Sequence, residues 1–246
     1  MSKLYIVGIG PGNIENMTRR ALQVLGDSEV IAGYTVYVDL VRAYFPDKEF
    51  FTTAMRQEVD RVEKALELAA GGKTVAMVCS GDGGVYGMSG LAEELSGKYP
   101  GVTVETVPGI SAMLSGAAIL GAPLMHDFAV ISLSDLLTPW EKIETRLRLA
   151  SQADFVICIY NPSSRKRKDY LQRACDIVLE SQSPETVCGI ARNIGRDGES
   201  ISIMRLSELR EAETDMFCTV FIGNSQTQVI NGKMVTPRGY HVGAEA

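Results

Sequence analysis

Three short glycine-rich segments carry the residues best suited to binding a small charged molecule. They are residues 8–12, 80–88 and 107–112. Glycine allows a backbone to approach a ligand closely, and amide groups at the start of a helix attract a carboxylate. The segments therefore predict a site for the α-carboxylate of an amino-acid-like cofactor, in which Asp82 pairs with a cation or a hydroxyl group. The alternative is structural, with tight turns and Asp82 as a helix cap.

The first of these segments does not match a dinucleotide-binding fingerprint. That fingerprint requires glycine at position 13 and an acidic residue at the end of the second strand. The chain has Asn13 at the first position, and Ala32 followed by Gly33 at the second. A nicotinamide-dependent oxidoreductase is therefore only a distant alternative.

The distribution of apolar residues predicts the elements that position these segments. Short apolar runs alternate with helical patterns in the first half of the chain, which predicts a mainly parallel sheet. The runs are residues 4–7, 30–32, 50–52, 75–79 and 102–107. Each glycine-rich segment follows a strand, at the sheet edge where open α/β proteins bind ligands. We expect this N-terminal α/β domain to span residues 1–122.

A second α/β domain is predicted for residues 123–246. Gly121 and Pro123 interrupt the chain after a long helix that begins at Ser111. Further on, Asp197 and Gly198 separate two closely spaced apolar runs, which predicts a hairpin and hence a mixed sheet. The predicted fold class is α/β, with two α/β domains, the first mainly parallel and the second mixed, and an active cleft between them.

The composition disfavours several classes of protein. The chain has 246 residues, 46% of them hydrophobic, and no apolar run approaches the roughly 20 residues of a membrane span. A net charge of −6 disfavours a nucleic-acid partner. Five widely spaced cysteines and only two histidines disfavour a disulfide framework and a resident metal. The first residues do not resemble a secretory signal, so we expect a cytoplasmic protein with no membrane contact.

The three glycine-rich segments resemble those of the tetrapyrrole (corrin/porphyrin) methylase family, and the resemblance covers essentially the whole chain. Residues 131–140, 159–165 and 191–199 look like the branch that methylates carbon 17 of precorrin-3B or cobalt-factor III, with ring contraction, in cobalamin synthesis. The resemblance implies a homodimer that uses S-adenosylmethionine, releases S-adenosylhomocysteine and acts on a small-molecule tetrapyrrole. Residues 85–88 look closer to the branch whose substrate already contains cobalt.

The resemblance also implies individual cofactor contacts. Those in the first domain are Pro11, Gly81, Asp82, Val85, Tyr86, Ser111 and Ala112, and those in the second are Tyr160, Asn193 and Thr219. Many family members have proline at the position of Gly83, so the resemblance implies a less rigid loop here.

Ring contraction requires proton transfers and closure of a lactone, so the resemblance also implies acid and base groups near the cleft. The catalytic candidates are Asp82, His126, Ser134 and Asp135. A hydrogen-bonded hinge residue is the favoured alternative for His126, and Asp135 is equally consistent with a turn or capping residue.

The carboxylates of a tetrapyrrole imply cations at the site, and arginine binds a carboxylate with two parallel hydrogen bonds. The substrate-binding candidates are Arg165, Arg167, Arg192 and Arg196. The basic run at residues 165–168 is also consistent with a solvated helix start. Trp140 is a candidate for stacking on the macrocycle, or else a residue of the core or rim.

Other functions of the same fold remain open at this point. The chain could methylate another tetrapyrrole carbon, a diphthamide precursor or ribosomal RNA, although RNA requires a basic face that the composition does not indicate. A non-catalytic corrinoid-binding module is a further alternative, but carriage alone does not explain a separate cofactor site.

Overall fold

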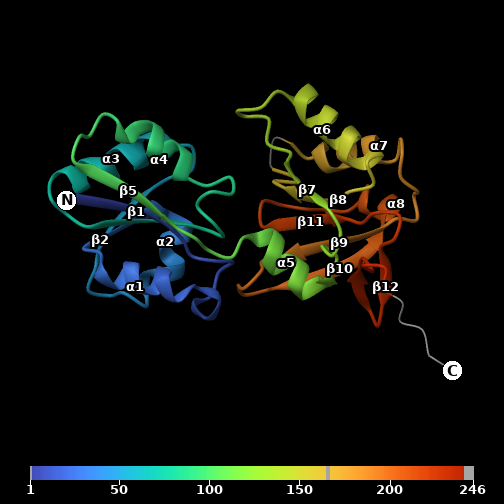
Figure 1. Cartoon of the computed structure of the whole chain (residues 1–246), viewed down its shortest axis with the longest axis horizontal. Coiled ribbons are helices and arrows are strands. Elements are labelled where there is room, and N and C mark those ends of the chain that lie inside the picture. The colour runs from blue at the N-terminus through green and yellow to red at the C-terminus, as the bar shows by residue number, and fades with distance from the viewer. Residues whose placement is uncertain (1, 165–166, 241–246) are drawn as a thin grey trace. The chain divides into compact units, whose positions relative to one another are not determined.

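The chain folds into two compact units, Met1–Ala112 and Met113–Ala246. The computed structural model describes residues 2–164 and 167–240 (Figure 1). The division falls at residue 112 rather than at the expected residue 122. The reason is α5 (Ala112–Leu120), which packs on the second unit. A Cβ added at Gly116 of this helix would lie 3.0 Å from the ring of Phe221.

A parallel five-stranded sheet forms the first unit. Its strands are β1 (Ser2–Gly8), β2 (Val30–Tyr34), β3 (Glu49–Thr53), β4 (Val75–Cys79) and β5 (Val102–Val107). Its helices are α1 (Arg19–Asp27), α2 (Thr35–Arg42), α3 (Glu58–Ala70) and α4 (Ser89–Ser96), with the short 3-10 helix η1 (Ile14–Asn16) after β1. The strand order is β3-β2-β4-β1-β5, and all pairs are parallel, as predicted.

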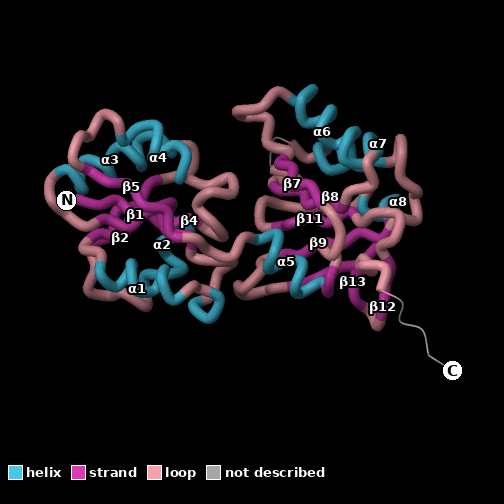
Figure 2. Tube along the Cα trace, in the orientation of Figure 1, coloured by secondary structure: helices cyan, strands magenta, loops and turns pink. Residues whose placement is uncertain are grey.

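Helices cover both faces of this sheet (Figures 1 and 2). In β4, Val75, Met77 and Cys79 pack in the cluster that contains α3 and α4. Ala76 and Val78 point to the opposite face and pack with α1 and α2. Because alternate residues of a strand face opposite sides, burial on both faces explains why these strands are continuous apolar runs.

A mixed five-stranded sheet forms the second unit. Its strands are β7 (Phe128–Ser132), β8 (Val156–Tyr160), β9 (Val187–Arg192), β10 (Ser200–Arg205) and β11 (Cys218–Ile222). The order is β10-β9-β11-β8-β7, in which β7 and β8 are parallel and the other pairs antiparallel. The predicted mixed sheet and the β9–β10 hairpin are confirmed. The helices α6 (Trp140–Gln152), α7 (Tyr170–Val178) and α8 (Leu206–Leu209) pack in one core with the sheet.

Three short strands that the sequence did not predict form a further sheet. They are β6 (Gly121–Ala122), β12 (Gln228–Ile230) and β13 (Lys233–Val235), in the order β12-β13-β6. The turn between β12 and β13 is Asn231-Gly232, and both residues have positive φ, 50° and 74°. This pair suits the two-residue turn of a tight hairpin.

The five cysteines are free and buried. Burial raises the pKa of the Cys79 and Cys218 thiols to about 11 and of the Cys158 and Cys175 thiols to about 12, and it also raises the pKa of Cys188. Cys79 lies in the first unit and the other four lie in the second. A neutral buried thiol reacts slowly, which agrees with a structural role for these residues.

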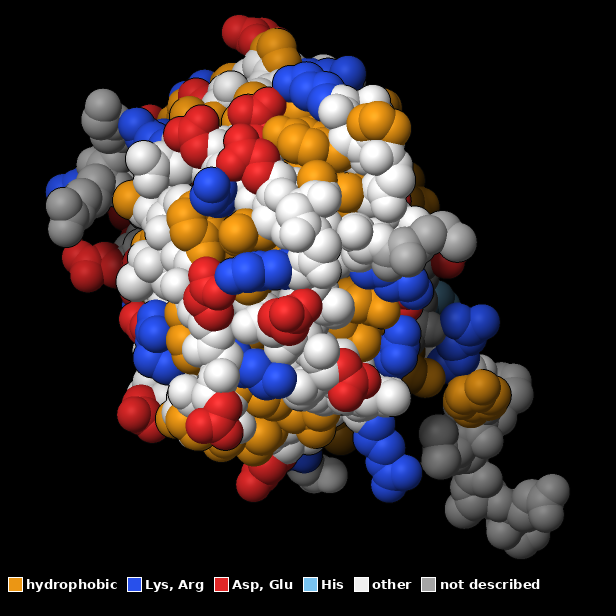
Figure 3. Space-filling model, turned by 90° about the vertical axis from the view of Figure 1, so that its left-hand side faces the viewer, with side chains coloured by type: hydrophobic (Ala, Val, Ile, Leu, Met, Phe, Trp, Pro, Cys, Tyr) orange, Lys and Arg blue, Asp and Glu red, His pale blue; other side chains and the backbone are white. Residues whose placement is uncertain are grey.

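The face of the molecule in Figure 3 mixes acidic and basic side chains among the residues that the structure describes. In the first unit, Lys3 and Arg20 both form ion pairs with Glu105, at 3.1 and 2.8 Å. Hydrogen bonds from Arg20 and Lys3 hold the pKa of Glu105 below its ordinary value. None of the described helices is long and apolar enough to cross a membrane.

Candidate functional site

The three glycine-rich segments meet at the carboxyl edge of the first sheet. Residues 8–12 begin at the last residue of β1, residues 80–88 follow β4, and residues 107–112 begin at the last residue of β5. Gly10 and Gly81 pair as an isolated bridge. The Gly81 amide donates to the Gly10 carbonyl at 2.7 Å, and the Gly10 amide donates to the Gly81 carbonyl at 3.1 Å. A pair of backbone hydrogen bonds therefore joins the first two segments.

Asp82 joins the second segment to the third. Its Oδ1 accepts a hydrogen bond from the amide of Gly84 at 2.8 Å, and its Oδ2 accepts one from the amide of Gly109 at 2.9 Å. Met88, not Asp82, is the N-cap residue of α4. The helix-cap interpretation is therefore wrong, because the Asp82 carboxylate spans two loops.

Two glycines are required where the segments touch. A Cβ added at Gly109 would lie 2.1 Å from the Gly81 carbonyl oxygen, and one at Gly8 would lie 2.6 Å from the Gly109 amide nitrogen. Both distances are far below van der Waals contact, and the atoms met are backbone. We call residues 8–12, 80–88 and 107–112 the three-loop junction.

The second loop of the junction is held by further local contacts. The Gly83 carbonyl accepts a hydrogen bond from the Ser89 amide at 3.0 Å, and a Cβ at Gly83 would lie 2.8 Å from the Ser89 hydroxyl oxygen. Glycine at this position therefore lies in a closely packed loop. Tyr86 has a positive φ of 54°, unusual for a bulky residue, and its side chain is half-exposed. Such strained residues tend to lie at functional sites.

Arg61 is a residue at this edge that the sequence did not single out. It is the one buried charged side chain among the described residues. Its Nε donates to the Thr53 hydroxyl at 2.7 Å and its Nη2 to the Ala54 carbonyl at 2.9 Å, both at the end of β3. A weaker contact at 3.9 Å reaches the sulfur of Met88, in the second loop. The sequence offered one signal for it, because Arg61 is a charged residue that lies among the apolar positions of α3, directly before Val62.

The second-domain cofactor candidates lie together at one edge of the second sheet. Tyr160 ends β8, Asn193 follows β9, and Thr219 lies near the start of the antiparallel β11. Thr219 pairs with Ala191, and the β8–β11 register places it beside Tyr160. The Tyr160 hydroxyl accepts a hydrogen bond from the backbone amide of Met113, in the first turn of α5. This is the edge at which β7, β8 and β9 end, and we call it the second carboxyl edge.

Two asparagines at this edge have left-handed backbones. Asn161 has a φ of 53° and Asn193 a φ of 49°, a conformation that asparagine adopts more readily than most residues. The Asn161 side-chain amide donates to the Ser132 hydroxyl at 2.9 Å, which ties β8 to the end of β7. Asn161 was not assigned from the sequence, although an Asn-Pro pair after a strand is a turn signal.

Ser134 and Asp135 form a polar network with Arg167 at the end of β7. Arg167 donates to the Ser134 hydroxyl at 3.1 Å, and its Nε lies 3.4 Å from Asp135. The Tyr170 hydroxyl donates to the other Asp135 oxygen at 2.6 Å, and this bond, with burial, raises the pKa of Tyr170. The structure therefore brings together two catalytic candidates and one substrate-binding candidate, and adds a tyrosine that the sequence did not single out.

Trp140 packs inside this unit against protein groups. Its ring centroid lies 4.4 Å from that of Tyr170, and the guanidinium carbon of Arg173 lies 4.1 Å from its ring centre. The indole N–H donates to Glu144. The core-or-rim interpretation therefore describes Trp140 better than stacking on a macrocycle.

His126 is not part of this network. It precedes β7, whereas Ser134 and Asp135 follow it, so the length of the strand, about 16 Å for five residues, separates them. The His126 Nε2 lies 2.9 Å from the carbonyl oxygen of Pro237. This contact fits the hinge interpretation and places His126 at the opposite edge of the sheet from the other second-unit catalytic candidates.

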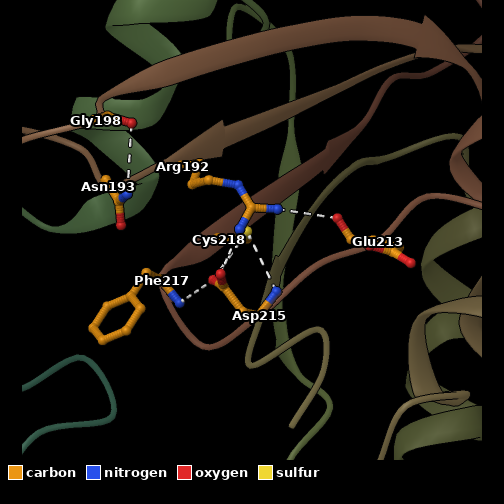
Figure 4. A network of polar contacts seen from close by, with 7 residues as sticks. All are labelled: Arg192, Asn193, Gly198, Glu213, Asp215, Phe217 and Cys218. Atoms are coloured by element: carbon orange, nitrogen blue, oxygen red, sulfur yellow. Dashed lines mark hydrogen bonds and ion pairs between the residues drawn. The ribbon is translucent and has the colours of Figure 1, made fainter.

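The arginine candidates differ in their contacts. Arg192 forms an ion pair with Asp215 and donates to the Glu213 carbonyl at 3.1 Å (Figure 4). Its charge is therefore compensated within the protein, because the loop that contains Asp215 folds back beside it. Arg196 lies 5.6 Å from the ring centre of Phe217. Arg165 lies outside the described residues. Within the described ranges, no three His, Cys, Asp or Glu residues come together as a metal site.

Each α/β unit has polar or glycine-rich segments at the carboxyl edge of its sheet. This arrangement is typical of a protein that binds small molecules, and the sequence has no dinucleotide fingerprint. Residues 3–210 match the family model of Tetrapyrrole (Corrin/Porphyrin) Methylases, and the chain belongs to this family.

Relatives and solved structures agree with this assignment. A probable cobalt-factor III C(17)-methyltransferase from Salmonella typhimurium is 46% identical over 238 residues, which cover 96% of this chain and 99% of the relative. A precorrin-3B C(17)-methyltransferase from a Sinorhizobium species is 40% identical, over 96% of each chain. The crystal structure of the methyltransferase CobJ matches with a TM-score of 0.88 and 34% identity, over 96% of this chain and 100% of that one. The predicted family, fold class and methyltransferase class are confirmed.

Proposed function

We propose that the chain transfers a methyl group from S-adenosylmethionine to carbon 17 of cobalt-factor III, with ring contraction, in cobalamin biosynthesis. The observation that carries the proposal is the 46% identity to a cobalt-factor III C(17)-methyltransferase over nearly the full length of both chains. Identity to the precorrin-3B enzyme is lower, at 40%. This difference favours the cobalt-containing substrate, as do residues 85–88.

The cofactor contributes an electrophilic methyl group. When bound, it would supply this methyl group to a nucleophilic carbon of the substrate, with the methyl–sulfur bond breaking, and would leave as S-adenosylhomocysteine. The protein's task is to position the two reactants, and correct placement accounts for a large part of the reduction of the reaction barrier.

We assign the first-unit contacts to Pro11, Gly81, Asp82, Val85, Tyr86, Ser111 and Ala112. The three-loop junction fits this role because its crossing points are backbone, with no room for side chains at Gly8 and Gly109.

The second unit supplies the remaining proposed contacts. Tyr160, Asn193 and Thr219 share the second carboxyl edge, which supports their assignment to the cofactor. Ser134 and Asp135 are proposed for the proton transfers of ring contraction. They lie at the same edge and are held by Arg167 and Tyr170. His126 receives no such support from its position.

For the substrate carboxylates, we propose Arg196. Arg167 is paired with Asp135, donates to Ser134 and has only 15% of its side chain exposed, so we propose that it positions these two residues. Arg192 is better explained as a brace of the loop that contains Asp215. A homodimer and a cytoplasmic location remain part of the proposal.

Transfer of a labelled methyl group tests the proposed function. Purified protein is incubated without oxygen with methyl-labelled S-adenosylmethionine and, in parallel, with cobalt-factor III, precorrin-3B or uroporphyrinogen III. We expect label in the cobalt-factor III product, with a mass increase of one methyl group and a ring-contracted spectrum. Label only in the uroporphyrinogen product would contradict the carbon-17 assignment.

A further inference from the structure

Phe217 is an exposed aromatic residue at the second carboxyl edge. It directly precedes β11, and 48% of it is exposed. In Figure 4 its ring points away from the polar network of Arg192 and Asp215. A single exposed apolar side chain is common on protein surfaces and by itself indicates nothing. The surroundings of Phe217 distinguish it from such a residue.

The backbone of Phe217 is fixed on both sides. Its amide donates to the Asp215 carboxylate at 2.8 Å, and its carbonyl accepts from the Asn193 amide at 3.1 Å. The second of these bonds extends the β9–β11 ladder by one residue beyond the Cys218–Arg192 pair.

Asp215 is itself held in place. It forms the ion pair with Arg192 and accepts a hydrogen bond from the Cys218 thiol at 3.3 Å. Arg192 also donates to the Glu213 carbonyl, so residues on both sides of Asp215 are tied down. The polar groups in this loop therefore preorganise Phe217, and a preorganised group loses less entropy when a ligand binds.

A cation lies beside the ring. The guanidinium carbon of Arg196 is 5.6 Å from the centre of the Phe217 ring, within the range of a cation–π interaction. Arg196 comes from the loop between β9 and β10, and its amide donates to the Asn193 carbonyl at 2.9 Å. Backbone hydrogen bonds to Asn193 thus hold both Phe217, which provides a flat apolar surface, and Arg196, which provides a cation.

We propose that Phe217 and Arg196 form a platform that binds the face and a carboxylate arm of a flat, conjugated, polyanionic ligand. Given the proposed function, on which this inference rests, that ligand is the tetrapyrrole. S-adenosylmethionine also has a flat ring and one carboxylate, but its ammonium and sulfonium groups give it a net positive charge, which disfavours a position beside Arg196. The tetrapyrrole combines a large conjugated surface with carboxylates and therefore fits both members of the platform.

Phe217→Leu and Phe217→Trp test the aromatic member. Phe128→Leu is a matched control, because Phe128 is 37% exposed at the start of β7, on the opposite edge of the same sheet. Cobalt-factor III binding is measured by anaerobic absorbance titration in the presence of S-adenosylhomocysteine, and S-adenosylhomocysteine binding alone by calorimetry. Circular dichroism and thermal unfolding establish that each variant is folded.

We expect Phe217→Leu to weaken tetrapyrrole binding about three- to tenfold, the range of aromatic stacking energies, and to leave S-adenosylhomocysteine binding unchanged. Phe217→Trp should restore tetrapyrrole binding, and Phe128→Leu should match the wild type. Equal loss of both ligands would assign the ring to the adenosyl group and overturn the proposal. So would unchanged tetrapyrrole binding in Phe217→Leu.

Arg196→Gln tests the cationic member. It should weaken tetrapyrrole binding and reduce its dependence on salt concentration, whereas Phe217→Leu should leave that dependence unchanged. A salt dependence equal to that of the wild type in Arg196→Gln would remove Arg196 from the platform. If the wild type itself does not bind cobalt-factor III, the proposed function fails first. A wild type that binds, with variants that bind equally well, refutes the platform alone.

Discussion

The carboxylate of Asp82 shows how much one residue contributes to the first-unit site. Its two oxygens bind amides in two different loops. Hydrogen bonds to a charged acceptor are stronger than neutral ones, so their loss should let the loops separate. We expect Asp82→Ala to weaken S-adenosylhomocysteine binding about tenfold, with the chain still folded, and Asp82→Asn, which keeps one acceptor, to lie between.

Calorimetry and thermal unfolding measure this effect. Asp60→Ala, at an exposed position on α3, is the control. Wild-type affinity in a folded Asp82→Ala protein would show that the carboxylate is not needed to organise the junction.

Arg61 leads to a prediction about stability. Arg61 is itself buried, and its hydrogen bonds to Thr53 and Ala54 are partly buried, so removal of the guanidinium leaves two partly shielded acceptors without this donor. We expect Arg61→Met to lower the free energy of unfolding by about 2 kcal/mol. Lys64→Met, at an exposed position on the same helix, should change it by less than about 0.5 kcal/mol. Denaturant titration measures both, and equal values for the two variants would contradict the role assigned to Arg61.

The sequence was informative about residue types and less so about their partners. Asp82, Ser134 and Asp135 were identifiable because polar residues followed predicted strands. The ion pair of Arg192 with Asp215 was not, since 23 residues separate them and a loop must fold back to join them. The distance of His126 from Asp135 likewise required knowing which end of β7 each one occupies.

At the scale of elements, the three-loop junction depends on close contact between backbones. A methyl group at Gly109 would overlap the Gly81 carbonyl oxygen, at 2.1 Å, and neither loop has a flexible side chain there that could move aside. We expect Gly109→Ala to lose measurable S-adenosylhomocysteine binding and to unfold at a lower temperature than the wild type.

Gly90→Ala is the matched control for this change. Gly90 lies in α4, and an added Cβ there meets nothing within 4 Å. Alanine in a helix is favoured over glycine by about 0.5 to 1 kcal/mol, so this variant should be at least as stable as the wild type. Normal binding by Gly109→Ala, measured by calorimetry beside Gly90→Ala, would mean that the junction opens easily.

Strands of the two large sheets were predictable because each is a run of apolar residues long enough to stand out. β4 and β5 begin and end where the sequence predicted. β6, β12 and β13 have only two or three residues each and are specified by pairing rather than by composition. The position of α5 was also hidden, because small residues in a helix do not reveal which sheet the helix contacts.

For the molecule as a whole, Asp154 predicts how stability depends on pH. Burial raises the pKa of Asp154, but hydrogen bonds from Ser225 and Gln182 outweigh burial and hold the pKa below its ordinary value. A carboxyl whose pKa is depressed by folding stabilises the protein above its unfolded pKa, about 4, and loses that contribution as pH falls through the folded pKa.

Asp154→Asn tests this dependence, since asparagine tolerates the positive φ of 58° at this position. The variant should be less stable than the wild type at pH 7, and the difference should shrink as the pH falls below about 4. Denaturant titrations from pH 7 to pH 3 give the comparison, with Asp47→Asn at an exposed position as control. A difference that stays constant with pH would exclude ionisation of Asp154 as its source.

Because the buried cysteines are unequally distributed between the two units, the number of thiols that react reports which unit has opened. An alkylating reagent that meets only transiently exposed thiols would add one label when the first unit opens and four when the second does. Because each unit has its own hydrophobic core, we expect mild denaturant to produce molecules with one or four labels before molecules with five. A mass spectrum with only unlabelled and fully labelled chains would instead show that the two cores open as a single cooperative unit.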